Sequence, residues 1–267
     1  MSRNVVRGVV GICLAVGMVV AAYGQGVYWE TTRSGGGMGD RVVHENMYYM
    51  PKKFKTESVE EGQAMILRLD KGLISSINTK DTTYWESTFA GLDSMMKKGK
   101  SKMDASMAKM QKEMEGMPEG QRKMIEQMMK GKMPGSAGGD SKIEVMKTDE
   151  TKNISGYPCT KFVVTENEKQ LLTVWATKSV KEFDAMRKDF QEFHKRIMEM
   201  NPMIPKGIVE GMQKIDGFAI ETDMPGGITQ VVTKVERRST PASAFEVPAG
   251  YTKVKPPSMG GEGEEEN

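Results

Sequence analysis

The stretch that decides the fold runs from residue 65 to residue 88 and reads MILRLDKGLISSINTKDTTYWEST. Two turn sequences, DKG at 70–72 and TKD at 79–81, divide it into three short runs rich in β-branched and aromatic residues. Residues of these types favour strands, and tight turns of this kind join antiparallel neighbours. The stretch therefore predicts three consecutive antiparallel strands, a β-meander.

Strand-like segments continue on both sides of this meander, and two helical blocks interrupt them. Further strands are predicted over residues 27–32, 41–50, 143–146, 160–165, 170–177, 218–222 and 228–235, with a final extended segment at 244–248. The order strands, helices, strands, helices, strands is typical of an α+β fold. We expect a curved antiparallel sheet with the helices packed on its concave face.

The first helical block, residues 89–133, is rich in methionine. Met103, Met107, Met110 and Met114 follow the spacing of one helix face. Pro118 can open a second helix at its first position, and the loop before it is short. We therefore predict a Met-rich helical hairpin inserted into the sheet, which is free to act as a mobile lid or an interaction arm.

The second helical block, residues 179–200, carries an aromatic stripe. Phe183, Met186, Phe190 and Phe193 are spaced three, four and three residues apart, as on one face of a helix. Phenylalanine buries a large apolar area. We therefore expect this helix to fill the concave side of the sheet.

The two ends of the chain have distinct compositions. Residues 1–24 read as a secretory signal peptide, with Arg3 and Arg7 before an apolar run that is shorter than a membrane-spanning helix requires. An uncleaved membrane anchor is the alternative. Residues 25–257 are expected to form a single α+β domain with the helical insertion at 89–133, and 258–267 a disordered acidic tail. The protein would then be periplasmic or secreted.

Charge and cysteine content exclude several classes of partner. The chain has 38 Lys and Arg against 36 Asp and Glu, and removal of Arg3 and Arg7 with the leader brings the formal charge to zero. This balance gives no indication of nucleic-acid binding. Cys13 would also be removed, so Cys159 has no disulfide partner within the chain.

Three phrases of the sequence resemble one known family. They are ILRLDKG at 66–72 followed by TTYW at 82–85, ISGYPCTKF at 154–162 followed by VW at 174–175, and FEVPAGY at 245–251. Together they resemble the secreted bacterial family called domain of unknown function 4412, which is similar in architecture to the periplasmic lipoprotein carrier and sorting proteins. The resemblance implies a half-open antiparallel barrel around helices, with a cavity of the kind that holds acyl chains in the carriers. It implies no catalytic residues.

Catalytic, zinc and phosphate sites are poorly supported by the residues. The candidate bases and ligands His44, His194 and Cys159 are far apart and lack the spacing of a catalytic or zinc site. The glycine-rich segment 34–39 has neither the lysine nor the following helix of a phosphate-binding loop. We therefore expect no enzymatic activity and no cofactor.

The methionines admit a second interpretation, since thioethers select soft metals such as Cu(I). The candidate ligands are Met103, Met107, Met110, Met114, Met117, Met124 and Met128. The same block is also basic, and a basic amphipathic helix can bind an anionic membrane surface. A solvated charged face over a buried apolar stripe is the structural alternative.

The favoured function is that of a non-enzymatic cell-envelope protein that holds an apolar ligand between its sheet and its helices. The ligand would be an acyl chain, a lipid or a lipidated peptide. The expected ligand-binding residues are Phe183, Met186, Phe190, Phe193, Met107, Met110 and Met114. The alternatives are a Met-rich periplasmic protein that binds copper or silver, and a ligand-free envelope protein with a structural or partner-binding role.

Overall fold

The computed structural model describes residues 23–115, 118, 120, 142–200 and 206–256. The strands are β1 (Tyr23–Ser34), β2 (Val43–Met50), β3 (Lys53–Ser58), β4 (Gln63–Arg68), β5 (Leu73–Asn78), β6 (Thr83–Thr88), β7 (Ile143–Ile154), β8 (Tyr157–Glu166), β9 (Lys169–Thr177), β10 (Phe218–Met224), β11 (Ile228–Pro241) and β12 (Thr252–Lys253). The helices are α1 (Phe89–Glu115), α3 (Phe183–Met200), α4 (Lys206–Lys214) and the short 3-10 helix η1 (Ala242–Phe245). The second helix of the predicted hairpin, nearly all of the predicted signal peptide and the predicted acidic tail lie outside the described residues.

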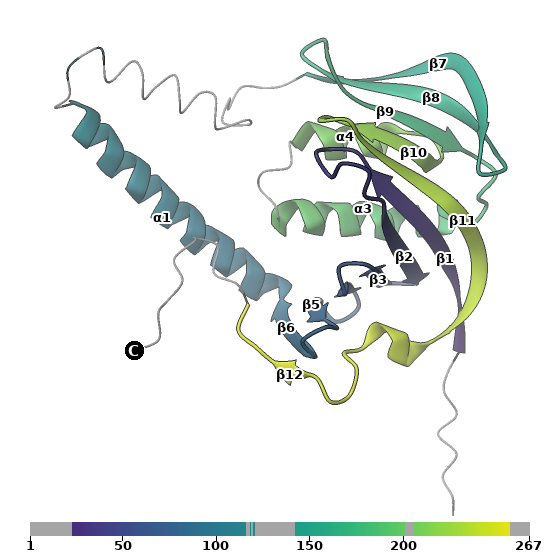
Figure 1. The fold of residues 1–267 in the computed structure, drawn as a ribbon, viewed down its shortest axis with the longest axis horizontal. Coiled ribbons are helices and arrows are strands. Elements are labelled where there is room, and N and C mark those ends of the chain that lie inside the picture. Colours follow the sequence, from purple (N-terminus) through teal and green to yellow (C-terminus); the bar gives the residue numbers. More distant parts are fainter. Residues whose placement is uncertain (1–22, 116–117, 119, 121–141, 201–205, 257–267) are drawn as a thin grey trace, which may run out of the picture.

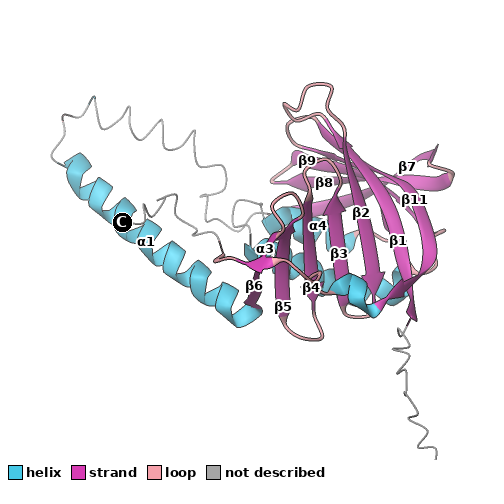
Figure 2. Ribbon diagram, turned by 60° about the horizontal axis from the view of Figure 1, so that its bottom comes forward, coloured by secondary structure: helices cyan, strands magenta, loops and turns pink. Residues whose placement is uncertain are grey.

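All of these strands belong to one sheet, in the order β12-β6-β5-β4-β3-β2-β1-β11-β10-β9-β8-β7. The sheet is strongly curved, and its two edge strands, β12 and β7, do not pair with each other, so it stays unclosed (Figures 1 and 2). The α+β class and the curved antiparallel sheet are confirmed. One pair departs from the prediction, because β12 runs parallel to β6.

The stretch 65–88 forms β4, β5 and β6 as predicted. In the turn between β4 and β5, Gly72 adopts the left-handed conformation with φ 62°, which glycine accepts without strain. Sequence reasoning missed β3, the strand that precedes this meander. Its residues are polar except Phe54, which is 2% exposed, so a single apolar position gave no visible alternation.

Several segments differ from their predicted extent. β7 continues through residues 147–152 by means of a bulge between Lys147 and Thr151, where only a short strand was expected. β11 is longer than predicted because it pairs with the long strand β1 from Thr229 to Pro241, while its first residues also pair with β10 on the other edge. The segment predicted as extended at 244–248 instead begins inside η1, which ends at Phe245.

The main core lies between α3 and one face of the sheet. Phe193 of α3 stacks on Phe54 of β3 with ring centroids 4.7 Å apart, and Phe190 contacts Trp29 of β1 at 5.7 Å. Met186, on the same helix, is 1% exposed. The aromatic stripe thus packs α3 directly on the sheet, and α4 lies beside it in contact with β7 and β8 (Figure 1).

α1 is placed differently from α3. Its first turns contact β6 and α3, where Leu92 joins the main core, and the rest of the helix extends away from the sheet in both views (Figures 1 and 2). α1 is the described helix of the predicted Met-rich insertion, which was expected as an arm apart from the helices on the concave face. In the part of the chain that the structure describes, none of the helices is both long and apolar enough to span a membrane.

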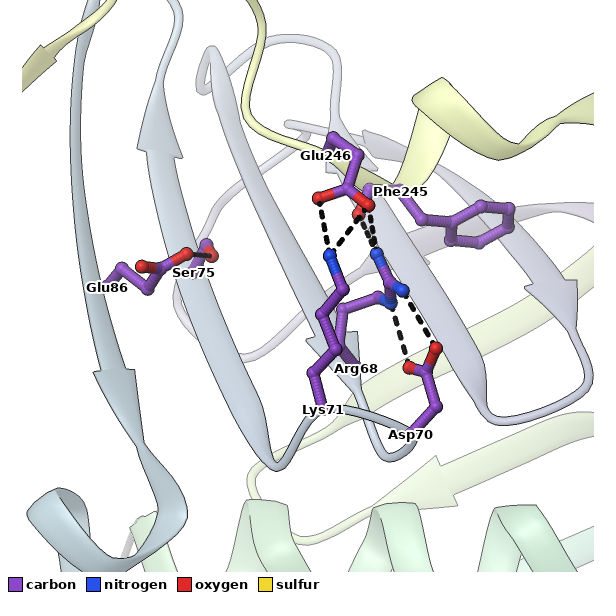
Figure 3. A network of polar contacts seen from close by, with 7 residues as sticks. All are labelled: Arg68, Asp70, Lys71, Ser75, Glu86, Phe245 and Glu246. Atoms are coloured by element: carbon purple, nitrogen blue, oxygen red, sulfur yellow. Dashed lines mark hydrogen bonds and ion pairs between the residues drawn. The ribbon is translucent and has the colours of Figure 1, made fainter. Parts of the chain in front are cut away.

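The opposite face of the meander carries a second, smaller core. Ile66, Ile77 and Phe245 are buried together there, because alternate residues of a strand point to opposite faces. A polar network closes this core at the β4–β5 turn (Figure 3). Arg68 donates to both carboxylate oxygens of Asp70 at 2.8 and 2.7 Å and also pairs with Glu246, which joins the turn to the segment after η1.

Candidate functional site

A cavity of about 190 Å³ lies between α3, α4 and the strands β1, β2, β10 and β11. Its lining residues are Trp29, Thr31, Met47, Phe183, Arg187, Phe190, Gln191, Phe193, Met212, Gln213, Ile215, Gly217, Phe218, Ala219, Ile220, Thr222, Gln230 and Val232. Gln191 and Gln213 are exposed, so the cavity reaches solvent at this end. Its floor is buried, since Ile220 is 1% exposed.

Helix periodicity and strand alternation together place these side chains. Residues 183, 190 and 193 fall on one face of α3, which faces the sheet. On β10, Phe218, Ile220 and Thr222 are two residues apart and line the cavity from the other side. Phe183 and Phe218 meet edge to face with ring centroids 5.6 Å apart, which closes one side of the cavity with aromatic surface.

The predicted ligand-binding residues are divided among different places. Phe183, Phe190 and Phe193 line the cavity. Met186 points into the packed core instead and does not line it. Met114 is buried, but on α1 and away from the cavity, while the side chains of Met107 and Met110 lie outside the described part of the chain.

Of the methionines of the alternative metal site, only Met114 has a side chain in the described part of the chain. The side chain of Met103 is not described, and Met117, Met124 and Met128 lie outside the described residues altogether. In the described ranges, no group of three or more His, Cys, Asp or Glu side chains could hold a metal ion.

Sequence reasoning missed the cavity residues that the sheet and α4 supply. Met212 and Ile215 were recognisable as one face of a short amphipathic helix. Trp29 and Thr31 could have been assigned to one face of β1 by strand alternation, and Phe218, Ile220 and Thr222 to one face of β10. Only the order of strands in the sheet shows that these faces meet.

Arg187 is the only charged residue among the described residues that line the cavity. Its Nη2 donates to Asp184 Oδ1 at 3.3 Å and to Asp216 Oδ1 at 3.5 Å, and its guanidinium lies 5.2 Å from the centre of the Phe183 ring. Hydrogen bonds from Lys178, and to a smaller extent from Arg187, hold the pKa of Asp216 below its usual value. The rim of the cavity thus presents a cation beside an aromatic ring.

Asp189 fixes the position of α3 on the sheet. Its Oδ2 accepts hydrogen bonds from the hydroxyl of Tyr49 at 3.0 Å and from the backbone N–H of Lys52 at 2.8 Å, and its Oδ1 lies 3.0 Å from the Lys52 ammonium. Burial alone would raise the pKa of Asp189, but these donors lower it below its usual value. Lys52 adopts a left-handed conformation with φ 64° in the β2–β3 turn, and no sequence pattern predicted this anchor.

The isolated cysteine and histidine stand apart from the cavity lining. Cys159 is 1% exposed, its thiol donates to the carbonyl of Tyr157 at 3.3 Å, and burial raises its pKa. The ring of His44 lies on the surface with Nδ1 2.5 Å from a carboxylate oxygen of Glu60. Cys159 thus belongs to the packed main core and His44 to the surface, and neither lines the cavity.

The protein is an unclosed antiparallel sheet packed against a helix that carries an aromatic face. A comparison with protein-family models identifies its family. A family model described as "Domain of unknown function (DUF4412)" matches residues 74–251. The chain therefore belongs to the domain of unknown function 4412 family. The phrases at 154–162 and 245–251 lie inside the matched range, whereas the phrase at 66–72 precedes it. No curated protein sequence matches the chain.

Several solved structures resemble this one at low sequence identity. The structure of PNGF-II in the C2 space group is 11% identical with a TM-score of 0.38, over 88% of this chain and 32% of that one. The crystal structure of MucB is 6% identical with a TM-score of 0.36, over 85% of this chain and 59% of that one. The complex of Pseudomonas aeruginosa MucA and MucB gives 8% identity and a TM-score of 0.34, over 85% and 56%. The chain thus spans less than two thirds of each of these proteins.

Proposed function

We propose that this chain is a non-enzymatic cell-envelope protein that binds an apolar ligand in the cavity between α3, α4 and the sheet. The observation that carries this proposal is the aromatic lining, to which Trp29, Phe183, Phe190, Phe193 and Phe218 contribute their rings. An apolar cavity with a few polar groups at its opening is the usual form of a small-molecule binding site.

The partial exposure of the lining supports binding rather than simple core packing. Met186 and Ile220 are each 1% exposed, whereas Phe183 and Phe190 are only half-buried although they belong to the same helix–sheet interface. A ligand that covered these two rings would be stabilised by about 0.8 kcal/mol for each methylene removed from water. Apolar burial alone can therefore hold a ligand here without a polar recognition motif.

The size of the cavity restricts what enters it. At about 190 Å³ it is smaller than the roughly 300–1,000 Å³ that is usual for ligand pockets. This size suits one short alkyl chain, or the end of an acyl chain that belongs to a lipid or a lipidated peptide. The lining also supports a binding role without covalent chemistry, because the one charged group among its described residues is an arginine, which stays protonated.

The proposed location in the cell envelope rests on the sequence of residues 1–24, which would direct export. Partner binding is a second candidate function, favoured by the way α1 extends away from the sheet (Figure 1). A helix that extends away from the sheet offers a surface that another protein could cover. The two functions are compatible, since they use different parts of the molecule.

Calorimetric titration of the purified protein with octanoate, 1-octanol and octylamine tests the proposal. We expect at least one of these compounds to bind with one-to-one stoichiometry. Thr222→Phe should abolish that binding because the larger side chain occupies the cavity. Thr233→Phe is the matched control, since Thr233 is exposed on the neighbouring strand β11 and does not line the cavity.

Each outcome of this titration either supports or contradicts the proposed binding site. Loss of binding in Thr222→Phe but not in Thr233→Phe, with both variants folded by circular dichroism, supports the cavity as the site. If none of the three compounds binds, or if Thr222→Phe binds as tightly as the parent protein, the proposed function is wrong.

A further inference from the structure

On the basis of the proposed function, we propose that the ligand is a medium-chain monocarboxylate whose carboxylate pairs with Arg187 and whose alkyl chain enters the cavity. The proposal commits to a free carboxylic acid as the source of the chain. It combines three observations: the charge at the rim, the availability of the arginine and the volume of the space behind it.

The charge of the rim selects the sign of the ligand. Of the described lining residues, only Arg187 is charged, and the other polar ones are amides and hydroxyls. A cationic head group would be repelled by the guanidinium, whereas a neutral one would gain a weaker hydrogen bond than an anion. A head group with one negative charge is therefore the best match for this rim.

The arginine has donors to spare for such a head group. Among the residues that the structure describes, its hydrogen bonds go to Asp184 and Asp216, and both use Nη2 at 3.3 and 3.5 Å. Both acceptors are well exposed, at 85% and 57% of the side chain, so these pairs are weak in water. The remaining N–H groups can make the paired hydrogen bonds that suit a carboxylate.

The surroundings allow Arg187 to change partner at little cost. Asp216 also pairs with Lys178, so it keeps a cation when the guanidinium turns to a ligand. Phe183, beneath the guanidinium, meets Phe190 at 6.0 Å and Phe218 at 5.6 Å between ring centroids. The cation and the aromatic interior are thus adjacent, as the two ends of an amphipathic molecule require.

The volume of the cavity sets the length of the chain. At about 190 Å³ the cavity is smaller than the usual ligand pocket, so it favours a short or medium alkyl chain over a long one. With the carboxylate held at the rim, the gain from each added methylene should end once the chain fills this space. Octanoate, a saturated chain of medium length, is therefore the reference ligand.

A series of carboxylates from butanoate to dodecanoate, titrated calorimetrically into the purified protein, tests this length. The dissociation constant should fall about fourfold per methylene up to octanoate, which corresponds to about 0.8 kcal/mol each, and should stop falling beyond it. Continued tightening through dodecanoate would overturn the proposed chain length and favour a longer acyl chain of a lipid or a lipidated peptide.

Head groups of equal chain length test the role of Arg187. Octanoate should bind about tenfold more tightly than 1-octanol, and octylamine more weakly than either. Arg187→Gln should remove the preference for octanoate while leaving the binding of 1-octanol unchanged, and Arg187→Lys should keep part of it. Lys188→Gln is the matched control, because this neighbouring lysine is exposed and does not line the cavity.

The possible failures of the two proposals are distinct. Equal binding of octanoate and 1-octanol, or an unchanged preference in Arg187→Gln, overturns the carboxylate inference and leaves the apolar cavity as a binding site. Tighter binding of octyl phosphate than of octanoate overturns the choice of carboxylate in favour of a phosphate head group. Absence of binding for every compound overturns the proposed function itself.

Discussion

α1 and α3 are both helices with regularly spaced apolar residues, yet the structure uses them differently. α3 lays its phenylalanines on Trp29 and Phe54 of the sheet. α1 contacts β6 and α3 at its base and then extends away from the sheet (Figure 1). Regular spacing thus predicts a helix and its apolar face, but it does not say what that face will contact.

The chemistry of the side chains explains part of this difference. Phenylalanine has a large rigid ring that gains most when it is enclosed, and rings that meet at an angle add further attraction. Methionine is flexible and adapts to several surroundings, so a methionine face is not committed to a particular core. At the base of α1 the contacts become aromatic again, with the Arg196 guanidinium 4.5 Å from the centre of the Phe89 ring.

The strongest test of the comparison is to remove a ring from the α3 interface. Phe54 is 2% exposed and contacts both Phe190 and Phe193. Phe54→Ala should lower the free energy of unfolding by about 3–5 kcal/mol, because the side chain leaves a cavity in a packed core. Urea denaturation measures the change.

An apolar residue on the surface provides the control for this variant. Met146→Ala replaces a side chain that is 59% exposed on β7, and its effect should stay within about 0.5 kcal/mol. Similar losses in the two variants would contradict the assignment of the main core to the α3 face.

The anchor of α3 should give the next largest effect. Asp189→Asn removes the charge that accepts from Tyr49 and Lys52, and should cost about 2 kcal/mol at neutral pH. The folded-state pKa of Asp189 lies below its ordinary value of 3.8, so its contribution is present above that pH and is lost as the pH falls through the folded-state pKa. The difference between variant and parent should therefore disappear in strong acid. A difference that persists unchanged there would rule out this anchor.

The polar network on the opposite face should respond to acid more weakly. Arg68 holds the pKa of Asp70 below its ordinary value of 3.8. Burial would raise the pKa of Glu246, but Lys71 and Arg68 lower it below 4.5. Stability that these carboxylates contribute is thus present above those values and is lost as the pH falls through the lower folded-state pKa values. Glu246→Gln should cost at most roughly 1 kcal/mol at pH 7, since half of this side chain is exposed.

The pH dependence of the free energy of unfolding shows how much this network contributes to acid sensitivity. As the pH falls below 4.5, the free energy of unfolding should decrease less steeply in the Glu246→Gln variant than in the parent protein. An identical slope in both proteins would show that Glu246 does not contribute to acid sensitivity.

The smallest effect is expected in α1. Ala105 is exposed in the middle of the helix, and Ala105→Gly should cost about 1 kcal/mol of local helix stability. Because α1 is held at its base, we expect less helical circular dichroism without a change in the urea midpoint of the sheet. If the free energy of global unfolding falls by as much as the local helix stability, α1 unfolds together with the rest of the protein.

Much of the fold could be predicted from local sequence, and the site could be predicted only in part. The turns at 70–72 and 79–81 carry their own conformational signals, so the meander was predictable. The phenylalanines of α3 were identified by their spacing. β3 was missed because its single apolar residue, Phe54, gives no pattern, and the parallel pairing of β12 with β6 depends on the path of the whole C-terminal segment.

The remaining cavity residues depend on contacts between distant strands. The rings of Trp29 and Phe218 meet edge to face with centroids 5.9 Å apart, although 188 residues lie between them in the sequence. This contact follows from the insertion of β11 between β1 and β10, which no local pattern reveals. Asp189 was missed for a similar reason, because its partner Lys52 becomes a donor only in the left-handed turn that β2 and β3 form.

The methionines allow the central claim to be tested directly, by NMR of protein labelled with ¹³C at the methionine methyl groups and titrated with octanoate. Met47 and Met212 line the cavity, whereas Met146 is on the surface of β7. A ligand in the cavity should shift the Met47 and Met212 signals with one common dissociation constant and leave Met146 unchanged. Unchanged Met47 and Met212 signals at saturating octanoate, or shifts confined to the methionines of α1, would contradict the account.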